Sequence, residues 1–306
     1  MVIYFPESEI GATDVYTSDW PITVDGIRLD TLAWNVESLS GRDLVPDLRG
    51  SNVQVPSRHG SIFAPGKKYD DGKLVLKMWV AGCDGAGGVP TNSYNEFRLN
   101  MDKLKALFGK RSGLLDVRKK DGAGGTRQAY CEMASGFDPD IFGVNPTGRF
   151  TVELDIPAVF WQDLTDVNHD DTTVNATSND MLLTNFVGAT APMEELWIVV
   201  DGPVNNPKVT DSATGHYVML NDTLGSGEQW VVNTTTWSSK VGSSIAFTTG
   251  GTNAILDTIS VGQHNPRYFA LSPSQDIEVG PAINFSNTGG TSAATRIRIR
   301  GKRKYL

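Results

Sequence analysis

Cysteine is nearly absent from the 306-residue chain, which has only Cys83 and Cys131. Two cysteines are too few for a disulfide framework or for a zinc site made of cysteines. Histidine is scarce as well, and none of the four has the HxxxH or HExxH spacing that places two metal ligands on one helix face. They are His59, His169, His216 and His264. We therefore expect two free thiols in a reducing compartment, and neither a metal nor a cofactor.

Long apolar segments and an excess of positive charge are also missing. No segment approaches 18 consecutive apolar residues, and the first twenty residues lack a basic region followed by an apolar one. We therefore expect neither membrane insertion nor a standard secretion signal. The net charge is -8, and a division near residue 165 leaves 18 basic against 22 acidic residues before it and 9 against 13 after it, or -4 for each part. Neither part is a basic module for gripping nucleic-acid phosphates.

The motifs of common active sites are absent too. There is no Gly-x-Ser-x-Gly nucleophile elbow, and no pair of carboxylates stands out among the 35 acidic residues. The sequence DGAGG occurs at 84–88 and at 121–125, but neither copy has both the strand before it and the helix after it that a phosphate-binding loop requires. We interpret both copies as turns, and we expect a protein that is not an enzyme and has no catalytic residue.

What the chain does have is 32 Gly, 15 Pro and many short alternating segments, a composition typical of a β-rich protein. In PITVDGIRL, the pair Asp25-Gly26 between alternating flanks predicts a hairpin. Further strands are expected in KLVLKMWVAG, GLLDVRKK, TRQAYCEMA and GRFTVELDIPAVF. This part of the chain is predicted to be a strand meander.

One segment has the period of an α-helix instead. Four large apolar residues recur at i, i+4, i+7 and i+11 and therefore share one face. They are Phe97, Met101, Leu104 and Phe108. We expect a helix over 93–108 packed on the sheet, with a capping box of Ser93 and Glu96 at its start and a left-handed stop at Gly109.

The segment 162–180 is polar, rich in Asp, Asn and Thr, and typical of a linker. Before it, we expect an extension at 1–20 and an α+β domain at 21–163 with one packed helix. After it, short strands between turn clusters over 164–306 predict a C-terminal β-sandwich or jelly roll. The predicted fold class is mainly β.

The last strand, RIRIRGKRKYL, places arginines and isoleucines at alternate positions. With the isoleucines turned inward, Arg296, Arg298 and Arg300 face outward. Two interpretations stay open: a contact with an acidic partner, or a charged edge strand that deters aggregation.

Aromatic residues raise a second possibility in the C-terminal domain. Trp230 and Trp237 are candidates for stacking on a sugar ring, because an exposed indole offers a flat apolar face. The alternative is that they belong to the core, which the apolar run QWVV favours for Trp230.

The whole pattern resembles the distal tail protein family of long-tailed phages, known as Dit. The N-terminal segments that carry the resemblance are PITVDGIRLDTLAWNV, the turn VPSRHGSIF, and KLVLKMWV followed by a single helix. The C-terminal ones are VVDGPVNNPKVTDSATGHYVMLNDTLGSGEQWVVNTTT, then FALSPSQDIEV and a basic final strand. The chain departs from the family at Ser57, where Gly is frequent, and at Ser274-Gln275-Asp276, which replaces Gly-x-Asn.

The resemblance implies a structural virion protein at the phage tail tip, assembled in the host cytoplasm. Six copies would form a ring that joins the tail tube protein to the tail-tip hub protein, with DNA passing through the channel of the N-terminal domains without specific binding. The second domain would be a galectin-like sandwich that can carry receptor-binding proteins. Arg58 and His59, in the turn between Pro56 and Gly60, are then candidates for a subunit interface.

Two other hypotheses remain open at this point. The first is a carbohydrate- or receptor-binding minor tail protein that acts through the C-terminal sandwich. The second is an enzyme such as a cell-wall hydrolase.

Overall fold

The computed structural model describes residues 22–41, 45–49, 53–54, 61–62, 68–88, 90–110, 113–120, 125–142, 146–171, 174, 176–261 and 269–306. The chain divides into two compact units, one ending at Trp161 and the other spanning Gln162–Tyr305. This division lies two residues before the boundary that the polar segment suggested. The expected extension at 1–20 lies outside the described residues.

Antiparallel strands build the first unit. They are β1 (Ile22–Val24), β2 (Ile27–Arg28), β3 (Trp34–Ser40), β4 (Leu48–Arg49), β5 (Val53–Gln54), β6 (Ser61–Ile62), β7 (Lys68–Tyr69), β8 (Gly72–Ala81), β9 (Leu115–Lys120), β10 (Thr126–Met133), β11 (Asp140–Phe142) and β12 (Thr147–Ile156). Its main sheet has the order β2-β1-β9-β10-β12-β8-β3, and β11 pairs with β12. A further strand, β13 (Trp161–Asp163), lies at the boundary of the two units.

The predicted hairpin at Asp25-Gly26 is confirmed. β1 and β2 pair antiparallel across these two residues, whose φ angles are 48° and 79°. A two-residue turn with positive φ at both positions matches the right-handed twist of the strands it joins, and Gly at the second position adopts it without strain.

The single α-helix among the described residues, α2 (Ser93–Phe108), has the predicted bounds and buries the predicted apolar face. The predicted capping box is wrong. Asn92 is the cap, and its side-chain oxygen accepts a hydrogen bond from the Asn95 N–H at 3.1 Å. The predicted left-handed stop is wrong as well, because Gly109 has a φ of -77° and its N–H continues the helical pattern to the Lys105 carbonyl.

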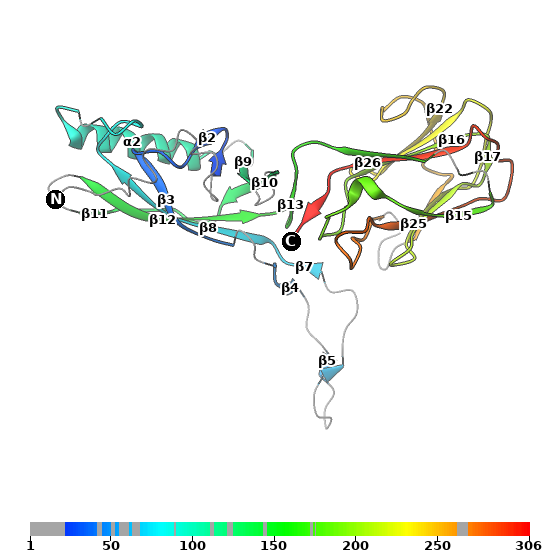
Figure 1. Cartoon of the computed structure of the whole chain (residues 1–306), viewed down its shortest axis with the longest axis horizontal. Coiled ribbons are helices and arrows are strands. Elements are labelled where there is room, and N and C mark those ends of the chain that lie inside the picture. The colour runs from blue at the N-terminus through cyan, green and yellow to red at the C-terminus, as the bar shows by residue number, and fades with distance from the viewer. Residues whose placement is uncertain are drawn as a thin grey trace. The chain divides into compact units, whose positions relative to one another are not determined.

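Helix α2 covers one face of the sheet of the first unit, as Figure 1 shows. A Cβ added at Gly148 would lie 3.2 Å from the Phe97 ring, so the face of β12 that carries Gly148 is the one against the helix. Strand β8 buries alternate residues from Leu74 to Val80 on that side. The opposite face of the sheet is open, and it carries both signs of charge. Its charged residues include Lys73, Lys77 and Arg149 and the acids Glu37, Glu153 and Asp155.

Strands of the second unit are again antiparallel. They are β14 (Val167–Asp171), β15 (Ser178–Leu182), β16 (Leu196–Asp201), β17 (Val204–Asn205), β18 (Lys208–Asp211), β19 (Tyr217–Leu220), β20 (Thr223–Leu224), β21 (Gln229–Asn233), β22 (Ser238–Gly242), β23 (Thr252–Asn253), β24 (Thr258–Val261), β25 (Ala282–Ser286), β26 (Arg296–Gly301) and β27 (Lys304–Tyr305). A short 3-10 helix, η2 (Thr184–Phe186), follows β15.

Two sheets make this unit a sandwich. One has six strands in the order β14-β26-β16-β21-β22-β23, and the other has five in the order β15-β25-β18-β19-β24. The two layers are visible in Figure 1, with β16 and β26 in one and β15 and β25 in the other. A single apolar core takes residues from both sheets, among them Ile198 and Trp230 from the first and Val209 and Phe285 from the second. The predicted mainly β fold with one packed helix and a C-terminal sandwich is confirmed.

Candidate assembly and contact surfaces

The segment VPSRHGSIF, residues 55–63, follows the short strand β5 and contains the short strand β6. β5 pairs antiparallel with β6, and outside them β4 pairs antiparallel with β7. Arg58 and His59, which lie between β5 and β6 in the sequence, are outside the described residues.

The three arginines of β26 face away from the sandwich core, as the alternation predicts. Ile297 and Ile299 are 1% exposed, whereas the three arginines that alternate with them are partly exposed. Each arginine already has a carboxylate within the chain. The ion pairs are Arg296 Nε to Asp201 at 3.1 Å, Arg298 Nη2 to Asp201 at 2.6 Å and Arg300 Nε to Asp166 at 2.8 Å.

The loop after β22 covers part of the arginine row, which consists of Arg296, Arg298 and Arg300. Gln229 accepts hydrogen bonds from the N–H groups of Ile245 and Ala246 and donates to Asp201 at 2.8 Å, which fixes the loop to the outer face of the sheet. The Phe247 ring lies 5.8 Å and 5.5 Å from the guanidinium carbons of Arg298 and Arg300. A partner contact through these arginines remains a prediction, and any such partner would meet guanidinium groups that are already ion-paired.

Trp230 is fully buried in the sandwich core, and its Nε1–H donates to the Ser239 hydroxyl at 2.8 Å. A buried indole face cannot stack on a ligand, so the predicted sugar contact at Trp230 is wrong. The physical reason is that Trp230 lies on the inward-facing side of β21, where it fills the space between the two sheets. Trp237 is half-buried against the same core, and a sugar contact there remains a prediction.

A buried carboxylate joins two of the segments that carry the family resemblance. Asp211 is 0% exposed and accepts four hydrogen bonds, from the N–H and hydroxyl of Thr214 and from the N–H and hydroxyl of Ser272. Thr214 belongs to the segment DSATGH and Ser272 to FALSPSQDIEV. A fully hydrogen-bonded buried carboxylate fixes the geometry of both loops. The sequence pattern gave no sign of Asp211, because its partner Ser272 is 61 residues away.

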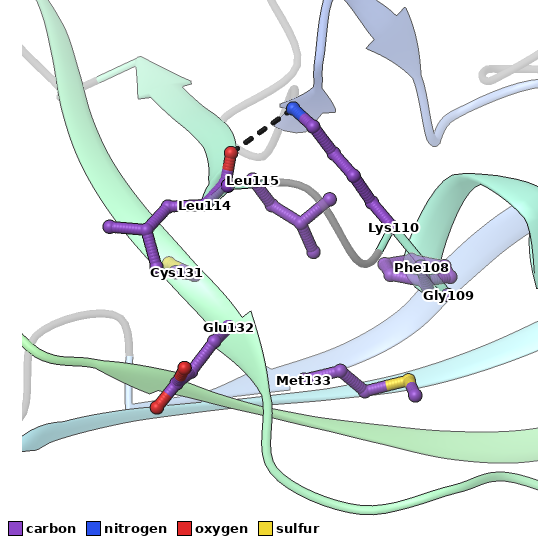
Figure 2. A pocket seen from close by; sticks show the side chains of 9 residues that line it. Phe108, Gly109, Lys110, Leu114, Leu115, Cys131, Glu132 and Met133 are labelled. Carbon is purple, nitrogen blue, oxygen red and sulfur yellow. Dashed lines mark hydrogen bonds between the residues drawn. The ribbon is translucent and has the colours of Figure 1, made fainter.

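A cavity of about 500 Å³ lies in the first unit at the C-terminal end of α2, as Figure 2 shows. Phe108, Leu115 and Cys131 contribute to its wall, and Lys110 donates to the Leu114 carbonyl at its rim at 3.1 Å. Burial raises the pKa of the Cys131 thiol to about 12, and the carboxylates of Asp116 and Asp155 act in the same direction. At neutral pH this residue is a protonated thiol, which is a poor nucleophile.

Neither a metal site nor a membrane span is found where the structure can be described. No three His, Cys, Asp or Glu side chains of the described ranges are grouped so that they could hold a metal ion. Within the same ranges, α2 and the short helices fall short of the length and apolarity needed to cross a membrane.

Comparisons with known proteins found similarity in structure but not in sequence. No protein-family profile and no curated protein sequence matches the chain. Among solved structures, the Dit protein of phage SPP1 matches with a TM-score of 0.60 and 12% sequence identity, over 94% of this chain and 99% of that one. A chain of the activated phage p2 baseplate matches with a TM-score of 0.41 and 10% identity. The chain therefore has the fold of SPP1 Dit along nearly its whole length. SPP1 Dit itself has been described as a paradigm of the hub adsorption apparatus in phages that infect Gram-positive bacteria.

Replacement of Asp211 by Ala is expected to lower the free energy of unfolding by about 3 kcal/mol, because it removes a buried carboxylate that accepts four hydrogen bonds and ties the Thr214 loop to the Ser272 loop. Urea denaturation measures the change. Asp222→Ala is the matched control, since Asp222 is an exposed aspartate of the same unit, and it is expected to change the value by less than about 0.5 kcal/mol. Equal effects of the two substitutions would contradict the role assigned to Asp211.

His169 is expected to make the protein less stable in mild acid. Burial lowers the pKa of His169 below its ordinary value, although Asp171 and Asp170 oppose the shift, and the Nε2 atom has no partner among the described residues. A lowered pKa means that the unfolded chain takes up the proton first, so stability is complete above about pH 6.5 and falls as the pH drops below it. Thermal unfolding between pH 8 and pH 5.5 is expected to show a smaller loss for His169→Gln than for the unchanged protein. Parallel curves for the two proteins would rule this out.

Proposed function

We propose that this chain is a distal tail protein of a long-tailed phage, a structural component of the tail tip without enzymatic activity. The observation that carries the proposal is the match to the fold of SPP1 Dit, which extends over both units and covers 99% of that chain. A likeness confined to the sandwich would fit many unrelated proteins, because sandwich architectures serve many functions. A match that spans an α+β unit followed by a sandwich is much more restrictive.

In this proposal six copies form a ring through the first unit, between the tail tube protein and the tail-tip hub protein. A closed ring uses a head-to-tail interface, in which each copy presents two different complementary patches. We assign one of these patches to the region of the paired strands β4 with β7 and β5 with β6. Arg58 and His59 are the residues that we assign to it.

The open face of the sheet in the first unit suits a channel through which DNA passes. This face carries basic Lys73, Lys77 and Arg149 among acidic side chains, and the Arg149 guanidinium is held by Glu37 at 2.7 Å. Tight phosphate binding requires a surplus of unpaired cations, because each phosphate contact adds affinity. A face with both signs of charge offers DNA little to bind, which supports passage without retention.

The second unit is the part that we assign to contacts with other tail proteins. Its arginine row is partly exposed at Arg296 and Arg300, each with about two fifths of the side chain accessible. An acidic partner that binds there would compete with Asp201 and Asp166 for the guanidinium groups.

The proposed ring gives a direct prediction for the purified protein. Light scattering at micromolar concentration is expected to report a mass near six chains, and Arg58→Glu is expected to shift the mass toward the single chain, because it reverses a charge at the assigned interface. Lys240→Glu, a charge reversal on β22 of the second unit, serves as the control and is expected to leave the mass unchanged. A ring that survives Arg58→Glu would remove Arg58 from the interface, and a monomer in the unchanged protein would contradict the ring itself.

A carbohydrate-binding protein is the second candidate function, and the half-buried Trp237 is the observation that favours it. If Trp237 stacks on a sugar, a glycan array is expected to show binding that Trp237→Ala lowers by about tenfold or more, as loss of an aromatic platform of about 1–3 kcal/mol would produce. If the unchanged protein binds no sugar on the array, only the structural role remains.

A further inference from the structure

Three exposed aliphatic side chains lie along the edge of the five-stranded sheet, at the end of β15 and beyond it. They are Leu182, Ile277 and Val279, which are 52%, 57% and 37% exposed. Leu182 ends β15, and the Leu183 N–H after it donates to the Pro281 carbonyl at 2.9 Å. Further along, the Gly188 N–H donates to the Ile277 carbonyl at 3.0 Å. These three side chains, the apolar row, therefore stand on a backbone that is hydrogen-bonded in place.

Carboxylates border the apolar row. Three of them are exposed and have no ion pair among the described residues, namely Asp180, Asp276 and Glu278. Asp276 holds the turn here, because its side chain accepts from the Glu278 N–H at 3.0 Å. Arg303 approaches the same edge and donates to the Val187 carbonyl at 3.0 Å, but its guanidinium is already paired with Asp163 at 2.6 Å. The apolar row thus has a negative border.

The outer side of helix α2, on the first unit, has the opposite character. It carries three exposed cations that have no ion pair among the described residues, namely Arg98, Lys103 and Lys105. Tyr94 and Leu99 on this helix are 50% and 53% exposed. The acids of the helix are the half-buried Glu96 and the exposed Asp102, so cations are in excess. In a chain with a net charge of -8, α2 is therefore a separate basic surface with exposed apolar groups.

The two surfaces are complementary in charge, and both have apolar groups to bury. An exposed apolar patch with a polar border is typical of a protein–protein contact, because burial of the apolar groups supplies affinity. Opposite charges around such a patch select the partner and set the register. A closed ring requires two different complementary patches on each copy. The apolar row and the outer side of α2 are such a pair.

We propose that the apolar row of one copy docks on the outer side of α2 of the next copy, with its carboxylates against the three helix cations. The inference rests on the proposed ring, because the occupant is a second copy of this chain. It adds a contact between the second unit of one copy and the first unit of its neighbour. The contact is head to tail, so it runs in one direction around the ring.

Cross-linking of the full chain tests this contact directly. Leu99→Cys and Ile277→Cys are made separately and together, and a short bismaleimide joins the exposed thiols, since the native Cys83 and Cys131 are buried. Co-expression of the two single variants is expected to give a cross-linked product of two chains. The double variant is expected to give products of up to six chains, and each single variant alone is expected to give none.

Two results of this experiment would overturn the proposal. One is the absence of any cross-link between the co-expressed variants. The other is a cross-link within either single variant alone, because it would show a like-to-like contact in place of the head-to-tail one.

Charge reversal tests the role of the carboxylates. Asp180→Lys with Glu278→Lys is expected to raise the concentration at which half of the assembly dissociates by about tenfold or more, because it places cations against cations. Asp276 is kept, since it holds the turn. Arg98→Glu with Lys105→Glu is expected to have the same effect. The variant with all four changes is expected to return to within about threefold of the unchanged protein, which two independently damaged surfaces would not do.

Asp222→Lys with Asp257→Lys is the matched control, because both are exposed aspartates of the second unit without an ion pair among the described residues. It is expected to leave the assembly unchanged. Failure of the fourfold variant to recover would overturn the proposal. An assembly of six chains with neither the cross-link nor the charge effect would overturn this contact and leave the ring standing, whereas a monomer in the unchanged protein would overturn both.

Discussion

Burial of one continuous apolar layer between the six-stranded and the five-stranded sheet is the constraint on which the second unit depends. Because side chains alternate along a strand, filling that layer with Ile297 and Ile299 turns the arginines of β26 outward. The outward arginines then need carboxylates, and Asp201, Asp170 and Asp166 supply them from neighbouring strands and the segment before β14. The charge pattern of the outer face thus follows from the packing of the inner one.

The first unit follows a related rule with a different outcome. Helix α2 buries one face of its sheet, and this leaves the other face for polar and charged side chains. In a sheet with one covered and one open face, core packing constrains the residues of the covered face only. The mixed charge of that open side is the property on which the proposed DNA channel rests.

How much of this could be predicted from sequence depended on the range of the interactions involved. The bounds of α2 followed from a period of 3.6 residues, and the hairpin at Asp25-Gly26 from two adjacent residues, so both were predicted correctly. The cap was misassigned because Asn92 and Ser93 are adjacent and either can cap; only the backbone geometry selects Asn92. Gly109 is compatible with several C-terminal conformations, so its presence did not fix one.

Contacts between distant segments could not be predicted at all. Asp201 lies 97 residues from Arg298, and the role of Asp211 depends on a loop 61 residues away, so neither had a local signal.

The central proposal is that six copies of this chain form a ring at the tip of a phage tail. Negative-stain electron microscopy of the purified full-length protein tests it most directly. The account predicts particles with six-fold symmetry and a central hole. A field of single, asymmetric particles at micromolar concentration would contradict it.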